Sequence, residues 1–282
     1  VLHSASGFTF TPAAGYFVRL TELYSSYAAA KQTADALTRM GYTAYPVCVY
    51  QCTWYVYLGG SGKYSEMESL KERLLRVGDF EEAEILSGNN YRIWVKGSFG
   101  TFLIDVDEHM AYPQFKPVTT YEDSAVYCID MGTRIYRGRM EIGRYQKSTL
   151  TAVNIVPLEE YLYSVVASEM PSTWNQEALK AQAVCARSYA LVKAGYQGES
   201  NAKKGYKLVD TTSSQVYKGY LAETSKSAAA VRATKGEMVC YDNQVVAAYF
   251  FSTSGGRTES SEAAWSVAKP YLVSVTDIYE TN

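Results

Sequence analysis

The segment 158–190 constrains the fold most, because its pattern predicts two helices joined by a turn. Apolar side chains in its first part recur at helical spacing, so one face of that helix is apolar. Glu169 continues this face, at roughly 20° from the line through Leu158 for about 100° per residue. Pro171 disfavours helical geometry at Met170, so the first helix is expected to end at or near Glu169.

The position of Glu169 suits a general acid. An apolar surrounding and the negative end of a helix dipole both favour the protonated form of a carboxyl group. A carboxylic acid that is still protonated near neutral pH is what general acid catalysis requires. The alternative is a structural glutamate at a helix end, bound to a nearby Arg or Lys side chain.

Length and charge limit the classes of protein to consider. The chain has 282 residues, enough for one large or two ordinary domains, and a formal net charge of -2. Charges of both signs are interspersed, so nothing favours nucleic acid as a partner. No apolar run approaches the ~18 residues of a membrane span. The 26 tyrosines suit sugar-binding clefts, although tyrosine is also common in sheets.

The cysteines and histidines are not spaced for a metal site. Five cysteines are scattered along the chain, and His3 and His109 lie far from them in sequence, so we expect no metal and no other cofactor. Cys48 and Cys52 flank an expected hairpin turn and could form a disulfide bond. The alternative is that the cysteines are simply small apolar side chains. The chain begins Val-Leu-His, without an initiator methionine or n-region, so we expect that a signal peptide or anchor has been removed.

The region 14–87 predicts a small α+β domain with the element order βαββαβ, a ferredoxin-like plait. Ser25 or Ser26 is the expected N-cap of its first helix, and Gly41 closes that helix. A capping box at 65–68 is expected to open the second helix, which runs to about residue 77. The strands are expected at 16–20, 43–50, 53–58 and 83–86.

This element order, with the opening Tyr16-Phe-Val, resembles a SPOR-like (sporulation-related repeat) domain. The resemblance implies binding to the glycan strands of peptidoglycan. The plait alone hosts many functions and implies none of them.

The region 88–282 predicts a second, larger domain of mixed α+β type. Its first part is rich in strands, and its last part contains a short helix over 225–234 and a hairpin around Asp242-Asn243. A Ser/Gly loop at 252–258 could bring backbone N–H groups to a ligand, or it is simply a turn. The strands are expected at 91–95, 101–106, 126–129, 134–142, 150–155, 237–240 and 244–251.

Polar residues near the central segment are candidates for substrate binding. Asn175 is the expected N-cap of the second helix, on which Lys180 and Arg187 share a face because they are seven residues apart. If this face meets a cleft, the two cations could hold a sugar carboxyl group or orient Glu169, the alternative being a solvated face. The full set of candidates is Lys180, Gln182, Arg187, Gln215, Tyr217, Ser252, Ser254, Gly255, Gly256 and Thr258.

Several segments resemble the signature of the stage II sporulation protein D and LytB (amidase enhancer) family, over about residues 125–282. They are Leu158-Glu-Glu-Tyr-Leu, Ser168-Glu-Met-Pro, Glu177-Ala-Leu-Lys-Ala-Gln-Ala-Val-Cys-Ala-Arg-Ser-Tyr-Ala, Gln215-Val-Tyr-Lys-Gly219 and Ser254-Gly-Gly-Arg-Thr258.

The family resemblance implies a lytic transglycosylase that acts on peptidoglycan glycan strands stripped of stem peptides, with Glu169 as catalytic acid and base. Some members carry a Cys/His zinc cluster near the segment that corresponds to Asp210-Thr-Thr. Here residues 206–215 contain neither Cys nor His, which again predicts no metal. The implied location is outside the cytoplasm, secreted or anchored at the cell wall.

A lytic transglycosylase can work with one carboxyl group, whereas a hydrolase usually needs two. Glu169 would protonate the oxygen between N-acetylmuramic acid and N-acetylglucosamine, and its carboxylate would then take the proton of the sugar's own 6-hydroxyl. Glu160 is nine residues away, roughly opposite in direction and about 13 Å along the axis, so it cannot be the partner. Asp210 and Glu259 are possible second carboxylates, so hydrolysis is an alternative reaction.

Two other hypotheses compete with this one. The first is a non-catalytic wall-binding protein that stimulates a separate N-acetylmuramoyl-L-alanine amidase, a role that the family name amidase enhancer reflects. The second is a serine nucleophile at Ser252 or Ser254, which ranks last because no Ser-x-x-Lys arrangement surrounds either residue and no histidine is close in sequence.

Overall fold

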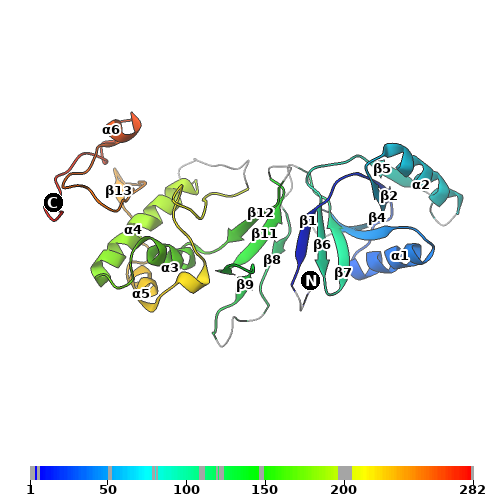
Figure 1. The fold of residues 1–282 in the computed structure, drawn as a ribbon, viewed down its shortest axis with the longest axis horizontal. Coiled ribbons are helices and arrows are strands. Elements are labelled where there is room, and N and C mark those ends of the chain that lie inside the picture. Colours follow the sequence, from blue (N-terminus) through cyan, green and yellow to red (C-terminus); the bar gives the residue numbers. More distant parts are fainter. Residues whose placement is uncertain are drawn as a thin grey trace. The chain divides into compact units, whose positions relative to one another are not determined.

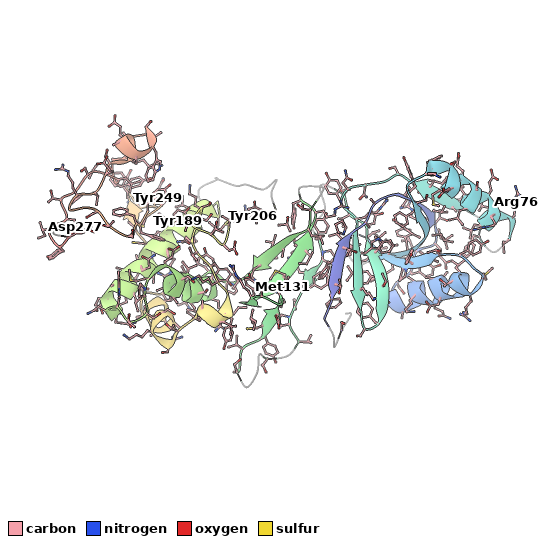
Figure 2. All side chains as sticks on the ribbon, viewed as in Figure 1. Arg76, Met131, Tyr189, Tyr206, Tyr249 and Asp277 are labelled. Atoms are coloured by element: carbon pink, nitrogen blue, oxygen red, sulfur yellow. The ribbon has the colours of Figure 1, made fainter. Side chains whose placement is uncertain are left out.

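The chain is a mixed α+β protein that divides into two compact units. Figure 1 shows their helices and strands, and Figure 2 adds the side chains. Unit 1 comprises Val1–Lys116, Arg139–Ile155 and Lys203–Gly205, and unit 2 comprises Pro117–Gly138, Val156–Ala202 and Tyr206–Asn282. The computed structural model describes residues 4, 7–49, 53–77, 80, 82–107, 112–118, 120, 124–145, 149–195 and 205–280.

Unit 1 is built on a seven-stranded mixed sheet with the strand order β1-β6-β7-β3-β4-β2-β5 (Figure 1). Neighbouring strands are antiparallel, except that β3 and β7 are parallel. The bounds are β1 Thr9–Pro12, β2 Tyr16–Leu20, β3 Ala44–Cys48, β4 Trp54–Ser61, β5 Ala83–Leu86, β6 Ile93–Gly97 and β7 Gly100–Ile104.

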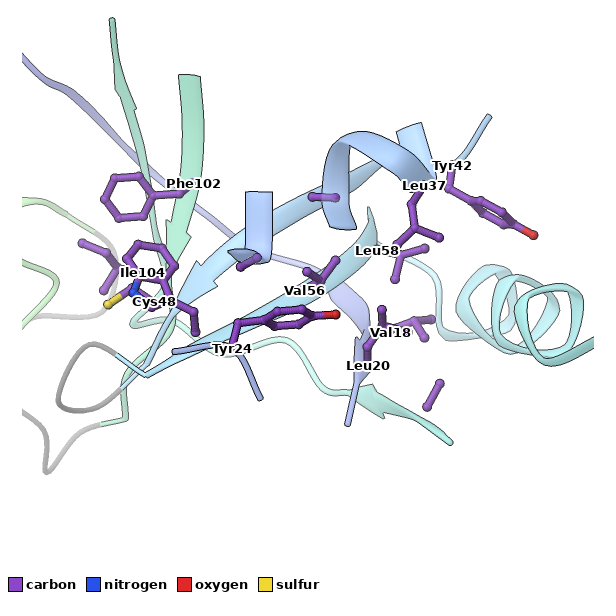
Figure 3. Close-up of a cluster of buried hydrophobic side chains, with 14 of the residues drawn as sticks. Val18, Leu20, Tyr24, Leu37, Tyr42, Cys48, Val56, Leu58, Phe102 and Ile104 are labelled. Atoms are coloured by element: carbon purple, nitrogen blue, oxygen red, sulfur yellow. The ribbon is translucent and has the colours of Figure 1, made fainter. Parts of the chain in front are cut away.

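Helices α1 (Tyr27–Arg39) and α2 (Tyr64–Arg76) cover one face of this sheet. Side chains alternate between the faces of a strand, so Val18 and Leu20 of β2 lie beside Val56 and Leu58 of β4 on the helix side. Leu37 of α1 packs against them, and Figure 3 shows this cluster. The core of unit 1 is therefore apolar and lies between the sheet and the two helices.

The opposite face of the sheet has its own buried cluster, which includes Phe17 and Tyr57. Arg92 is almost wholly buried beside it, with its Nε atom 2.9 Å from Asp105 Oδ2 and its guanidinium group over the Phe17 ring. A buried guanidinium group needs such a partner, since an unpaired buried charge is costly.

The predicted start and end of α1 are confirmed, whereas the predicted start of α2 is wrong. Ser26 is the N-cap of α1 and accepts a hydrogen bond from the backbone N–H of Ala29 at 3.2 Å. Gly41 follows the helix with φ +90°, which glycine adopts without steric cost. Helix α2 begins earlier than the capping box at 65–68 predicted, and its N-cap, Lys63, makes no side-chain cap bond.

The elements of 14–87 follow one another in the predicted order, β2-α1-β3-β4-α2-β5. The compact unit nevertheless extends beyond the predicted boundary between residues 87 and 88. Strand β7 pairs with β3, β6 pairs with β7 and β1, and a three-stranded sheet belongs to the same unit. The SPOR-like nature of 14–87 stays a prediction. The three-stranded sheet consists of β12 (Thr151–Ile155), β11 (Arg139–Gly143) and β8 (Gln114–Phe115).

The regular secondary structure of unit 2 is mainly helical. Apolar residues of α3, such as Leu162 and Val166, pack on Leu179 and Ala183 of α4 and on Ala230 of α5. The alanines let the helices approach closely, as the sequence predicted. Its elements are β9 Cys128–Asp130, β10 Ile135–Arg137, α3 Leu158–Glu169, α4 Gln176–Lys193, the 3-10 helix η3 Tyr220–Ala222, α5 Ser225–Ala233, β13 Cys240–Tyr241, β14 Gln244–Val245 and α6 Ser261–Trp265.

Two strand predictions in the region 88–282 are corrected by the structure. The strand expected at 134–142 is divided into β10 and β11 at Gly138, where φ is +80°. The hairpin turns at Asp242 and Asn243, both with positive φ as a type I′ turn requires, but its ladder is only two residues long. Cys52 lies outside the described residues, so its pairing with Cys48 stays a prediction.

No helix in the described part of the chain combines the length and the apolar character of a membrane span.

Candidate active site

Glu169 is the last residue of α3, because Met170 adopts extended backbone ahead of Pro171. Its half-buried carboxyl group accepts a hydrogen bond at Oε1 from the backbone N–H of Val216, at 2.6 Å. Among the described residues this is the one hydrogen bond to the group, which leaves Oε2 available. The partner is a backbone amide, not the Arg or Lys side chain of the structural alternative.

The segment that carries this amide is anchored by Gln215. The side chain of Gln215 is fully buried, accepts a hydrogen bond from the Tyr161 hydroxyl at 3.1 Å and donates one to the Ala186 carbonyl at 3.2 Å. These bonds attach it to both α3 and α4, so the next residue, Val216, is fixed against Glu169. Gln215 was predicted to bind substrate, and the structure gives it a positioning role instead.

Two tyrosine rings pack between the anchored segment and α3. The rings of Tyr161 and Tyr217 have centroids 5.0 Å apart. Burial raises the pKa of both phenols, and for Tyr161 the nearby charges of Tyr189 and Glu169 act in the same direction. Tyr161 therefore stays neutral close to the candidate acid. Tyr217 was predicted to bind substrate, but only 7% of it is exposed, so it is mainly a core residue.

Arg187 is 1% exposed and forms a bidentate ion pair with Glu159, with both N–O distances at 2.8 Å. It also donates to the carbonyl groups of Glu237 and Val231 at 3.0 and 3.2 Å. The guanidinium group therefore joins α3, α4 and α5 and has no face left for a sugar. This corrects the prediction that Arg187 could hold a sugar carboxyl group, because every one of its nitrogen atoms is engaged within the fold.

The other two candidates on α4 differ from Arg187. Lys180 lies at the surface and pairs with Glu177 at 2.7 Å, a type of ion pair that contributes little and exchanges readily. Gln182 is 7% exposed, and its Nε2 atom has no hydrogen bond partner among the described residues. The hydroxyl groups of Ser164 and Ser168 are also buried without such a partner. Buried donors of this kind are uncommon and often mark a site for water or ligand.

The Ser/Gly loop folds back on the C-terminal segment. The backbone N–H of Ser254 donates to Glu280, and its hydroxyl, which has a single proton, lies within hydrogen-bond distance of both Glu280 and Asp277, at 3.0 Å from the latter. Hydrogen bonds from Ser254 and then Thr253 lower the pKa of Glu280 to about 2. The anion at this loop is thus a carboxylate of the chain itself.

The remaining loop candidates are placed as follows. Thr258 donates its backbone N–H to the Val275 carbonyl at 2.8 Å, and Ser252 is exposed. Gly255 and Gly256 have φ of +63° and +91°, which explains why glycine stands there. No hydrogen bond or ion pair among the described residues joins 252–258 to Glu169, so their role in substrate binding stays a prediction.

Most other acidic side chains around α3 are in ion pairs. Arg134 binds Asp210, which was one possible second carboxylate. Arg137 binds Glu223 through two bonds of 2.7 and 2.8 Å and lies 4.0 Å from Glu160. Burial raises the pKa of Glu223, and the bonds to Arg137 partly offset this. Glu259, the other possible second carboxylate, is exposed in the C-terminal segment.

Some residues of the site had no signal in the sequence. The Val216 donor is a backbone group, so the residue type carries no trace of it. The sequence indicated Tyr161 only as one of the apolar positions of the first helix, and it gave no expectation for Glu159. In the described part of the chain no cluster of three or more His, Cys, Asp or Glu side chains could hold a metal ion.

The family model described as SpoIID, stage II sporulation protein, matches residues 146–241, which include Glu169 and Val216. The chain is 44% identical over 135 residues to Stage II sporulation protein D of Bacillus subtilis (strain 168), across 44% of this chain and 39% of that protein. The protein of the same name from Bacillus amyloliquefaciens is 42% identical over 142 residues, across 46% and 41%.

The Amidase enhancer of Bacillus subtilis (strain 168) is 40% identical over 116 residues, across 41% of this chain and 15% of that protein. The chain therefore spans about two fifths of the length of the sporulation proteins that it matches, and less of the amidase enhancer.

Proposed function

We propose that this chain, which belongs through residues 146–241 to the SpoIID/LytB family, is a lytic transglycosylase of peptidoglycan. It would cleave the bond between N-acetylmuramic acid and N-acetylglucosamine in glycan strands without stem peptides, outside the cytoplasm. One observation carries the proposal: the carboxyl group of Glu169 is fixed at Oε1 by the Val216 amide, while Oε2 has no partner among the described residues.

In the first step the Oε2–H group of Glu169 donates its proton to the glycosidic oxygen as the bond from that oxygen to C1 breaks. N-Acetylglucosamine leaves with a free 4-hydroxyl, and positive charge develops at C1 of the muramic acid unit. The Val216 N–H can donate to Oε1 in both the acid and the carboxylate form, at 2.6 Å here. The group therefore keeps its orientation between the two steps.

In the second step the Glu169 carboxylate takes the proton of the 6-hydroxyl group, and the 6-oxygen bonds to C1. This closes a 1,6-anhydro ring and restores the acid without consuming water. A single carboxyl group suffices for both steps. The neighbouring acids support this one-carboxyl mechanism, because Glu159, Glu223 and Asp210 each form an ion pair with an arginine.

The test incubates the full chain with glycan strands stripped of peptides and identifies the products by mass spectrometry. We expect anhydro-ended fragments, and a loss of at least about a hundredfold in rate for Glu169→Gln. The matched control is Glu177→Gln, an exposed glutamate on α4. Fragments with reducing muramic acid ends would instead identify a hydrolase, and an unchanged rate in Glu169→Gln would refute the assignment.

The second candidate is a wall-binding protein that stimulates a separate N-acetylmuramoyl-L-alanine amidase. The observation in its favour is the similarity to the Amidase enhancer, at 40% identity over 116 residues. Glycan binding without any cleaved product, together with faster release of peptides by an added amidase, would select this function.

For unit 1 we propose glycan binding by partly exposed side chains on the sheet face that the helices do not cover. Tyr45, Tyr55 and Trp94 lie half-buried on that side, with the Tyr45 and Trp94 rings 4.6 Å apart. Such rings offer apolar faces with polar tips, which suits sugars. Tyr55→Ala and Trp94→Ala should weaken co-sedimentation with glycan strands, whereas Tyr64→Ala on α2 should not. Equal binding by all three variants would contradict this role.

A further inference from the structure

A row of aromatic side chains runs from α4 to the C-terminal segment of unit 2. It consists of Tyr189 on α4, Tyr249 after β14 and Trp265 at the end of α6. The ring centroids are 5.7 Å apart for the first pair and 4.6 Å apart for the second, and Figure 2 shows Tyr189 and Tyr249 side by side. The exposed fraction rises along the row from 8% to 36% and 55%. The row is therefore anchored at one end and open to solvent at the other.

The anchored end of the row lies near the segment that holds the candidate acid. The Tyr189 side chain lies beside that of Ser214, which is two residues before the Val216 amide that binds Glu169. Tyr161 lies within electrostatic range of both Tyr189 and Glu169. The row thus begins near the segment that holds the acid and becomes more exposed toward Trp265.

Lys193 lies beside this row. Lys193 follows Tyr189 by one turn of α4, and its Nζ atom is 5.9 Å from the Tyr189 ring centroid and 6.0 Å from that of Tyr249. Within the described part of the chain this ammonium group forms no ion pair. Aromatic rings hold a cation in place but leave its charge uncompensated, so an anion of a ligand can still bind there.

We propose that Tyr189, Tyr249 and Trp265 form one wall of saccharide subsites leading away from Glu169, and that Lys193 binds the lactyl carboxylate of a muramic acid unit. The inference rests on the proposed function. Rings of this kind stack on the apolar C–H faces of sugars. In glycan stripped of peptides the lactyl group is a free carboxylate, whereas a stem peptide converts it to a neutral amide. The positive charge of Lys193 would therefore favour glycan without stem peptides, because only there is the lactyl group an anion.

The test measures binding by titration calorimetry in the full chain with Glu169→Gln, so that cleavage does not interfere. Two ligands of equal length are compared: a peptide-free peptidoglycan oligosaccharide and a chitin oligosaccharide, which lacks the lactyl group. Trp265→Ala should weaken binding of both about tenfold, because it removes one exposed ring face. Trp265→Phe should retain most of the affinity, and the control Tyr127→Ala, at an exposed tyrosine of unit 2 outside the row, should retain all of it.

Lys193→Met should weaken binding of the peptidoglycan oligosaccharide about threefold to tenfold and leave chitin binding unchanged. The control Lys226→Met, at an exposed lysine on α5, should change neither. The wall is refuted if Trp265→Ala and Tyr249→Phe/Trp265→Ala both bind within twofold of the parent. The carboxylate contact is refuted if Lys193→Met affects both ligands equally or neither.

These outcomes are separate from the test of the enzyme. If the unsubstituted chain binds glycan through the row but yields no anhydro-ended fragments, the proposed activity fails and the binding surface stands.

Discussion

Unit 1 and unit 2 fill their interiors with different kinds of side chain. The core of unit 1 between the sheet and its helices is apolar, with Leu20, Leu58 and Leu74 almost wholly buried. In unit 2 the interior around α3, α4 and α5 also contains charged and polar side chains. The buried ones are Ser164, Gln182, Arg187, Ser188, Gln215, Ser227 and Thr234.

Burying polar groups costs free energy unless their hydrogen bonds are satisfied, so they contribute less to stability than apolar groups of the same size. In unit 2 the buried polar groups fix the positions of backbone segments. Arg187 joins three helices, and Gln215 holds the segment whose amide binds Glu169. Unit 1 also buries Arg92, Glu141 and Arg144. The two arginines are bound to backbone carbonyl groups and an aspartate around the sheet, and Glu141 accepts hydrogen bonds from Gln114 and Tyr145. The comparison suggests that unit 1 is built for stability and unit 2 for a fixed site.

The largest effect is expected from Arg187→Met, which leaves the Glu159 carboxylate without its partner. It should lower the free energy of unfolding of unit 2 by about 3–5 kcal/mol, measured by urea unfolding with circular dichroism. Combining it with Glu159→Met should recover much of the loss, because no unpaired charge then remains. A single variant that loses less than about 1 kcal/mol would show that this pair does not hold unit 2 together.

The apolar counterpart in unit 1 is Leu58→Ala, at a residue with no exposed surface. The cavity should cost about 2–5 kcal/mol in the same unfolding experiment. Leu23→Ala, at a residue that is 60% exposed, is the control and should change stability by about 0.5 kcal/mol or less. Equal losses at the two leucines would mean that the sheet core does not dominate the stability of unit 1.

The variant Gln215→Met distinguishes the orientation of Glu169 from the stability of unit 2, because the two are measured separately. It removes the bonds to Tyr161 and Ala186 and should cost about 1–3 kcal/mol. Cleavage should fall about tenfold in kcat with little change in KM, because the Val216 amide no longer orients Glu169. The control is Gln176→Met at the first turn of α4. A purely structural role for Gln215 would leave the kcat of the folded fraction unchanged.

The smallest effect concerns a buried acid in unit 1. Burial raises the pKa of Glu141, to which Gln114 and Tyr145 donate hydrogen bonds. Since the pKa in the folded state lies above that in the unfolded state, its contribution to stability is complete below the unfolded pKa and is lost as pH rises through the folded value.

Unfolding free energies between pH 4 and 8 should therefore decrease less with pH in Glu141→Gln than in the parent. An identical pH dependence for Glu141→Gln and the parent would contradict the raised pKa.

Local signals in the sequence were sufficient to predict most helix ends and the position of Glu169 at the end of a helix. Ser26, Gly41 and Asn175 cap or close helices through bonds to their own neighbours, and Pro171 restricts the residue before it. The capping box at 65–68 failed because the helix begins before it, and the Ser61 hydroxyl instead binds the Lys63 N–H and the Glu66 carboxylate. The boundary at 87/88 differs from the compact units because β7 pairs with β3, which is distant in sequence.

The sequence by itself determined that a carboxyl group ends an apolar helix, since periodicity and a proline act within a few residues. Only the tertiary structure decided what holds that group, because the Val216 donor is a backbone amide 47 residues away. It also decided that Arg187 and Gln215 bind other parts of the fold, although their polarity had suggested that they bind a ligand. A polar side chain next to a motif can face solvent, a sugar or the interior, and the choice depends on which distant segments fold against it.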